Sequence, residues 1–367
     1  MNGRDGQTRG TSDGRTLIPS PDSRKRGTRQ RVQSLDKLTD QQLLDLRICD
    51  LKLTIQGTWL APCVRRLYDE LADRRLKFRP HCWLSSEWFS PAGVPGVAIP
   101  FYLAHPRLMR LENKMMLDVE GGTKTSCMRL LRHEAGHAIE VAYKLDRRPR
   151  WRRIFGNASR PYPTHYRPKP FSRDYVLHLD WWYAQSHPTE DFAETFAVWL
   201  RPGTMWRRRY RNWPALKKLE YLDNLMNELA GRRPMVTSRE RSDPLSALKM
   251  TLRAYYEERQ ARYGSDYPAF YDSDLRRLFS EAPEHAKCPP ASQFLRSTGA
   301  RLRNRVAAWT GVYAYTVDQI LREMISRCRD LKLRVHRPTD ELRTEVAILL
   351  TMQVTNYIHS NEHRLAL

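Results

Sequence analysis

The hexapeptide RHEAGH, at positions 132–137, is the feature that most constrains how this chain can fold. On an α-helix His133 and His137 lie one turn apart, so both imidazoles point toward one position beside the helix. Glu134 lies about 100° further around the helix, close enough to act on a bound water molecule without being a ligand. Histidines at this spacing are typical zinc ligands, and a catalytic zinc needs a third protein ligand and an open position for water. The hexapeptide therefore predicts a helix that holds one zinc ion per chain, with a third ligand from another segment.

Composition and charge indicate a folded, strongly basic protein. The chain has 367 residues, 41% of them hydrophobic, which is enough for a substantial core in one enlarged domain or in two domains. The net charge of +22 favours polyanionic partners such as nucleic acid, acidic peptides or anionic lipid, although a solvated basic surface gives the same balance. The six cysteines form no C-x-x-C pair, which argues against a disulfide framework and a thiolate zinc finger. Because no apolar leader and no run of about 20 apolar residues is present, we expect a cytoplasmic protein with no membrane contact.

The sequence pattern divides the chain into three parts. Residues 1–33 are polar and basic with almost no large apolar side chain, which predicts a disordered basic tail. Residues 34–235 mix helix and strand patterns around the hexapeptide and are expected to form a catalytic domain. Residues 244–367 are predicted to be mostly helical, with an apolar face within 317–331, and the sequence does not indicate their role.

Apolar spacing predicts the main elements of the central part. Helices are expected over 38–53 and 57–74, followed by two or three strands within 78–112 and a turn at 91–96, where Pro and Gly recur. Ser126 is the expected N-cap of the helix that carries the hexapeptide. Residues 146–175 are rich in Pro and basic residues and predict a long loop. Two further helices are expected over 188–200 and 215–231.

The third ligand must come from downstream of His137. One class of zinc peptidase places a histidine six residues after the second histidine, but Tyr143 occupies that position here. The downstream side chains that can bind zinc are His165, His178, His187, Glu190, Asp191 and Glu194. Glu190 and Glu194 are one helical turn apart, so one carboxylate can bind zinc while the other holds a ligand histidine by its second nitrogen. We favour Glu190 as the ligand, since it opens the helix and Tyr183 lies seven residues before it, where a phenol can stabilise an oxyanion.

Two segments carry a resemblance to known peptidases. HEAGH (133–137) and YAQSHPTEDFAETF (183–196) resemble the glutamate-ligand, or gluzincin, zinc peptidases grouped around anthrax-toxin lethal factor, the Pro-Pro endopeptidases and the Mlc titration factor family. The chain is most similar to a bacterial family described only as zinc-binding metallopeptidases, and EWFSPAGVPGVAIPFYLAHPRL (87–108) is also typical of that group. The resemblance implies an α+β, zincin-like domain with a small sheet, an active-site helix and a ligand helix, followed by a mostly helical C-terminal region.

The same resemblance implies roles for individual residues. The zinc ligands that it implies are His133, His137 and Glu190. Glu134 would be the general base and Tyr183 the oxyanion donor. Glu194 would not bind the zinc but would hold a ligand histidine by its second ring nitrogen.

These features together predict a zinc-dependent peptidase that hydrolyses a peptide or protein substrate with a water molecule activated by zinc and Glu134. Residues 146–174 hold nine basic side chains against two acidic ones, and residues 195–219 hold seven against none, so an acidic substrate is expected. The substrate would add as a strand at a sheet edge; residues 96–101 are a candidate, although an ordinary core strand fits the same pattern. The rival hypothesis is a nucleic-acid-associated protein, bound through its basic surface, whose zinc site is structural or vestigial.

Overall fold

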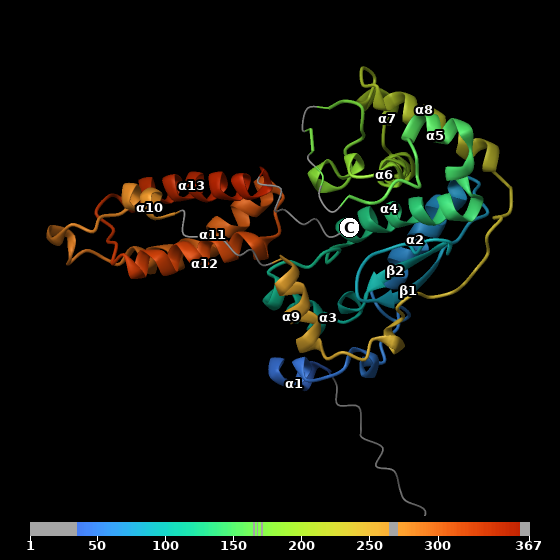
Figure 1. Ribbon diagram of the computed structural model, residues 1–367. Coiled ribbons are helices and arrows are strands. Elements are labelled where there is room, and N and C mark those ends of the chain that lie inside the picture. The colour runs from blue at the N-terminus through green and yellow to red at the C-terminus, as the bar shows by residue number, and fades with distance from the viewer. Residues whose placement is uncertain (1–34, 164–165, 167, 170–171, 264–270, 360–367) are drawn as a thin grey trace, which may run out of the picture.

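The computed structural model describes residues 35–163, 166, 168–169, 172–263 and 271–359, so the predicted tail over 1–33 lies outside the described residues. Within them the chain is mostly helical with a small two-stranded parallel sheet, which fits the predicted α+β class (Figure 1). The described α-helices are α1 (Asp40–Leu44), α2 (Leu60–Asp73), α3 (Pro106–Met116), α4 (Lys124–Tyr143), α5 (Pro149–Phe155), α6 (Pro188–Leu200), α7 (Trp206–Arg209), α8 (Ala215–Leu229), α9 (Leu252–Tyr263), α10 (Asp272–Leu278), α11 (Ala291–Thr310), α12 (Ala314–Asp330) and α13 (Thr339–His359). The strands are β1 (His81–Ser85) and β2 (Gly96–Pro100). None of the described helices has the length and apolar character needed to cross a membrane.

The single helix predicted over 38–53 is wrong. The short helix α1 is followed by a separate 3-10 turn, Ile48–Leu51. The helix is interrupted because the N–H groups of Ile48 and Cys49 donate to main-chain carbonyls of the segment 248–250, at 3.0 and 2.9 Å. These bonds replace the helical ones and tie the start of the described chain to the segment that precedes α9.

The helix that carries the hexapeptide, α4, begins at a different N-cap from the predicted one. Thr123 is the N-cap, and its Oγ1 accepts the N–H of Ser126 at 3.1 Å. Ser126 in turn accepts the N–H of Thr123 through its Oγ at 3.1 Å, so the two residues form a reciprocal capping box. The helix then continues to Tyr143 through the whole hexapeptide.

The long loop predicted over 146–175 is partly helical. The helix α5 occupies Pro149–Phe155, and its proline stands at the first helical position, where the missing N–H costs no hydrogen bond. Gly156 ends the helix at a φ of 112°, which favours glycine. Among the described residues, irregular chain therefore begins at Gly156 rather than at residue 146.

The small sheet is part of the core. β1 and β2 pair in parallel with His81 opposite Gly96, and all five residues of β2 are buried. The free side of β2 is covered by an antiparallel bridge in which Ala98 N–H donates to the carbonyl of Phe89 at 2.8 Å. The structure therefore supports the core-strand alternative for residues 96–100, and the prediction of a substrate-binding edge there is wrong.

Buried apolar side chains form two clusters. The first extends from Leu43 to Tyr256 and joins α2, α4, α6 and α8 with α9. The second extends from Tyr271 to Val354 in α10–α13, which Figure 1 shows as a separate group of helices. The apolar face predicted within 317–331 packs in this second cluster. The division between the two apolar clusters thus lies after α9. The domain boundary between 235 and 244 stays a prediction.

Candidate metal centre

Gly136 and Ala193 set the distance between α4 and α6. A Cβ atom on Gly136 would lie 2.7 Å from the Cα of Ala193, so only glycine allows the two backbones to approach this closely. His133 and His137 lie on either side of Gly136 in α4, and Glu190 lies in the first turn of α6. The close helix packing therefore brings the polar side chains of the two helices together.

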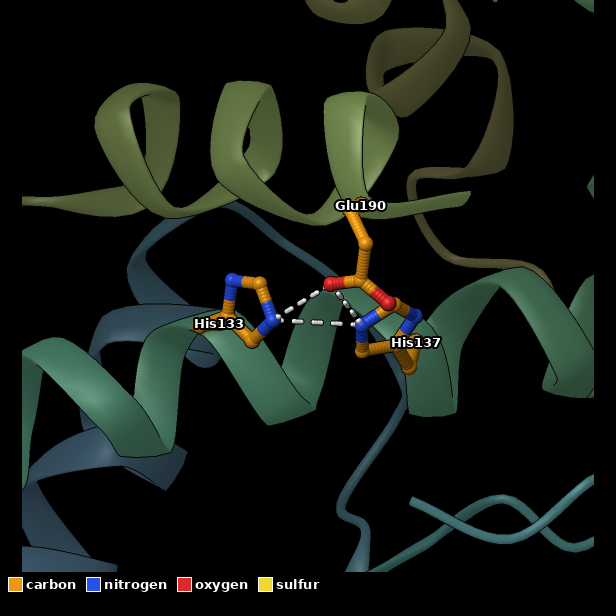
Figure 2. Close-up of side chains that lie close together, drawn as sticks. All are labelled: His133, His137 and Glu190. Atoms are coloured by element: carbon orange, nitrogen blue, oxygen red, sulfur yellow. Dashed lines mark hydrogen bonds and ion pairs between the residues drawn. The ribbon is translucent and has the colours of Figure 1, made fainter. Parts of the chain in front are cut away.

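Three donor atoms meet between these helices (Figure 2). The Nε2 atoms of His133 and His137 lie 3.0 and 3.1 Å from Oε2 of Glu190, and the two nitrogens are 3.2 Å apart. Among the described residues, these three form a group close enough to hold a metal ion. In a tetrahedral zinc site with bonds of about 2.0–2.1 Å, donor atoms are roughly 3.3 Å apart. Both the donor types and their spacing fit a zinc ion.

The electrostatics of the cluster also favour a cation. Burial would raise the pKa of Glu190, but His137 and His133 hold it well below its usual range. Burial would lower the pKa of His133, but hydrogen bonds to Glu190 and Glu194 raise it well above its usual value. The buried charge of Glu190 thus needs positive charge between the helices, which protonated histidines or a bound metal cation can supply.

Glu194 faces the opposite nitrogen of His133. Its Oε1 lies 2.9 Å from Nδ1 of His133, and its Oε2 accepts the N–H of Leu179 at 2.8 Å. Both carboxylate oxygens of Glu194 therefore make their hydrogen bonds away from the three donor atoms. Glu190 thus lies at Nε2 of His133, on the side of the ring that faces His137, and Glu194 lies at Nδ1 on the other side.

Glu134 and Tyr183 lie beside the cluster. The Glu134 side chain makes no hydrogen bond or ion pair to another described residue, and burial raises its pKa although His133 and His137 oppose the rise. Tyr183 lies in the 3-10 turn Asp180–Gln185, with its ring centroid 5.6 Å from that of His133. Burial, Glu190 and Glu134 together raise the pKa of the Tyr183 phenol, so it keeps its proton at neutral pH.

The other candidate ligands are engaged elsewhere or lie outside the described residues. His187 is the N-cap of α6, and its Nε2 donates to a main-chain carbonyl 2.7 Å away. Nε2 of His178 lies 3.0 Å from a carbonyl oxygen of α4. Asp191 pairs with Lys218 at 2.6 Å. His165 lies outside the described residues.

Tyr162 is a residue of the site that sequence reasoning missed. Its hydroxyl donates to Oε1 of Glu190 at 2.9 Å, and its ring stacks on His187 with centroids 3.9 Å apart. This bond occupies the oxygen of Glu190 that does not face the histidines and so directs Oε2 toward them. The only signal in the sequence is its position between two prolines, which restrict the main chain.

Arg132 anchors the helix that carries both histidines. Its Nε and Nη2 donate to the two carboxylate oxygens of Glu70 in α2, each at 2.7 Å. Both side chains are at most 5% exposed, so this is a buried, bidentate pair. It holds α4 against α2 at the residue before the first histidine.

The comparison with protein families agrees with this geometry. Residues 123–205 match a family described as "Putative zinc-binding metallo-peptidase". The match begins at the N-cap of α4, ends beyond α6 and contains every residue of the donor triangle. It indicates peptidase activity on a peptide or protein substrate. No curated protein and no solved structure gave a match.

Proposed function

We propose that the chain is a zinc-dependent peptidase of the gluzincin type, in which His133, His137 and Glu190 hold one zinc ion. The observation that carries the proposal is the triangle of two imidazole nitrogens and one carboxylate oxygen, with sides of 3.0–3.2 Å, between α4 and α6. The family match over 123–205 supports the same assignment. The small sheet packed against α4, which in turn packs against α6, supports a zincin-like catalytic domain.

The side chains around the donor triangle would divide the chemistry between them. Bound zinc would lower the pKa of its water to about 7 and polarise the scissile carbonyl. Glu134 accepts the proton of the attacking water and delivers it to the leaving amine; its raised pKa makes it a stronger base than an exposed glutamate. The Tyr183 hydroxyl donates a hydrogen bond to the carbonyl oxygen as negative charge develops there. Glu194 meanwhile fixes the ring of His133.

A preference for acidic substrates is part of the proposal, and it is supported by the basic stretches 146–174 and 195–219, which lie on either side of Glu190 in the sequence. Close to Glu134, by contrast, lies a second carboxyl group, that of Glu120. Burial raises the pKa of Glu120 to about 7; the charge of Arg259 opposes the rise, and those of Asp118, Glu87 and Glu134 add to it. An acidic residue of the substrate is therefore expected to bind at a distance from the cleaved bond rather than beside it.

Zinc analysis and peptide cleavage test the proposal in the wild type, Glu134→Gln and Glu140→Gln. Glu140 lies on the same helix and is also buried, but it is outside the donor triangle, so its variant is a matched control. We expect about one zinc per chain in all three proteins. Cleavage of a proteome-derived peptide mixture, detected by mass spectrometry, should occur in the wild type and in Glu140→Gln. It should fall by about 10²–10⁴ in Glu134→Gln, because the general base is lost.

Two results would contradict the proposal. A wild type that binds no zinc after reconstitution would remove the metal centre. A Glu134→Gln variant that cleaves at the wild-type rate would remove the proposed base.

A further inference from the structure

A cavity of about 840 Å³ opens where α4 ends. Two segments without helix or strand assignment line it, one over 76–79 between α2 and β1 and one over 236–239 after α8. Val236 donates its N–H to the carbonyl of Ala142 at 3.0 Å, which ties the second segment to the last turn of α4. None of the donor residues of the metal centre lines this cavity, so it is a separate site.

The lining of the cavity is strongly basic. It contains Arg75, Lys77, Arg79 and Arg239, and no acidic side chain. Within the described part of the chain, none of these four cations forms an ion pair with a carboxylate, whereas Arg132 and Arg259 pair with buried glutamates. Uncompensated cations in a concave surface concentrate the field there and attract anionic groups.

The two lining segments also have main-chain N–H groups that can bind a ligand. Side chains over 76–80 are alternately buried and exposed, which is the pattern of an extended strand. The N–H groups of 77–79 and of 237–239 donate to no acceptor among the described residues, so the two segments do not pair with each other. An extended peptide placed in the cavity can pair with one of them as an added strand.

We propose that this cavity binds an extended, acidic segment of a partner protein. Lys77 and Arg79 are two residues apart and both exposed, so they match the spacing of alternate carboxylates on one face of a bound strand. A peptide fits better than a single-stranded nucleic acid, whose bases stack on exposed aromatic rings. The aromatic rings in the lining are those of Phe78, which is only 3% exposed, and His81, which is already stacked on Trp83 with centroids 5.0 Å apart. The proposal does not depend on the peptidase activity.

The binding of a fluorescein-labelled octapeptide of alternating Glu and Thr to the full chain tests the charge of the cavity. The cavity variant is Lys77→Glu/Arg79→Glu/Arg239→Glu. The control variant makes the same charge change at three exposed positions of α11, Arg296→Glu/Arg301→Glu/Arg305→Glu. Fluorescence anisotropy should show binding about tenfold or more weaker for the cavity variant and changed less than about twofold for the α11 variant. Equal weakening in both variants would mean that overall charge alone attracts the peptide, which would overturn the proposal.

Controls keep the result interpretable. Thermal unfolding and zinc content should be the same in both triple variants and the wild type; if the cavity variant does not fold, Lys77→Gln/Arg79→Gln replaces it. Glu134→Gln should bind the octapeptide as the wild type does, so a failure of the proposed catalytic mechanism leaves this test intact.

The chemical class of the ligand has its own test. The same octapeptide N-methylated at alternate residues keeps its charge but loses main-chain donors, so its binding should be about tenfold weaker. Pentathymidylate, with four phosphates, should bind more weakly than the unmodified peptide. Unchanged binding after N-methylation, or equally tight binding of pentathymidylate, would overturn the assignment to an extended peptide.

Discussion

Nδ1 of His133 and Oε1 of Glu194 lie 2.9 Å apart, and both side chains are almost fully buried. The contact uses the nitrogen that does not face Glu190 and therefore fixes the ring with Nε2 toward the other donors. Glu194→Ala should weaken zinc binding by about 10–100-fold, and Glu194→Gln, which keeps an acceptor oxygen, should weaken it less. Competition with a chromogenic chelator measures both affinities. Wild-type affinity in Glu194→Ala would show that the carboxylate does not orient the ligand.

The close approach of α4 and α6 should be sensitive to one methyl group. In Gly136→Ala the new Cβ would meet the backbone of Ala193, so the helices must separate, at a cost of about 1–3 kcal/mol in the free energy of unfolding. Separation also lengthens the distance between the histidines and Glu190, so zinc affinity should fall. Gly299→Ala is the matched control, because there the Cβ meets only the end of the Leu321 side chain at 3.0 Å. Equal zinc affinity in both variants would contradict the role of Gly136.

Loss of the Tyr183 hydroxyl and loss of the Tyr162 hydroxyl should change different quantities, kcat and zinc affinity respectively. Tyr183→Phe removes the proposed oxyanion donor, so kcat should fall by about 10²–10³ with zinc affinity unchanged. Tyr162→Phe removes the bond to Oε1 of Glu190, so zinc affinity should fall while kcat of the zinc-saturated enzyme changes little. Steady-state kinetics and chelator competition on both variants check this split. The reverse pattern would exchange the two roles.

Glu140 should make the free energy of unfolding depend on pH. Its Oε2 is buried without a hydrogen-bond partner in the described structure, and burial, with the charges of Asp146 and Glu190, raises its pKa well above the usual value. As pH rises above the ordinary glutamate pKa, the unfolded chain ionises before the folded one, so the contribution of this group to stability is progressively lost. The glutamine of Glu140→Gln does not ionise in either state, so this pH-dependent loss of stability disappears. The variant should be more stable than the wild type by about 1–3 kcal/mol near neutral pH, and by less in acid.

Denaturant unfolding of the zinc-free wild type and Glu140→Gln at about pH 5 and about pH 8 measures this effect. The advantage of the variant should increase with pH. A difference in stability that is the same at both pH values would show that Glu140 does not titrate differently in the folded and unfolded states.

Local spacing was sufficient to predict the two helices that form the site. The bounds of α6 agree with the predicted 188–200, and the turn of helix between His133 and His137 brings their imidazoles together. Features that depend on contact between distant segments could not be predicted in this way. Tyr162 reaches Glu190 from an irregular segment, and Ile48 leaves the helical pattern because it bonds to a segment 200 residues later.

The place of α9 in the first cluster decides where a shortened chain must end if the packing around the metal centre is to be kept. Arg259 of α9 lies 2.5 Å from the buried carboxylate of Glu112, and Tyr256 is fully buried in that cluster. A chain ended at residue 243 would leave Glu112 without its cation, whereas a chain ended at Tyr263 would keep the pair and the packing. The helices α10–α13 thus carry an apolar core of their own, whereas α9 belongs to the core of the helices that hold the donor triangle.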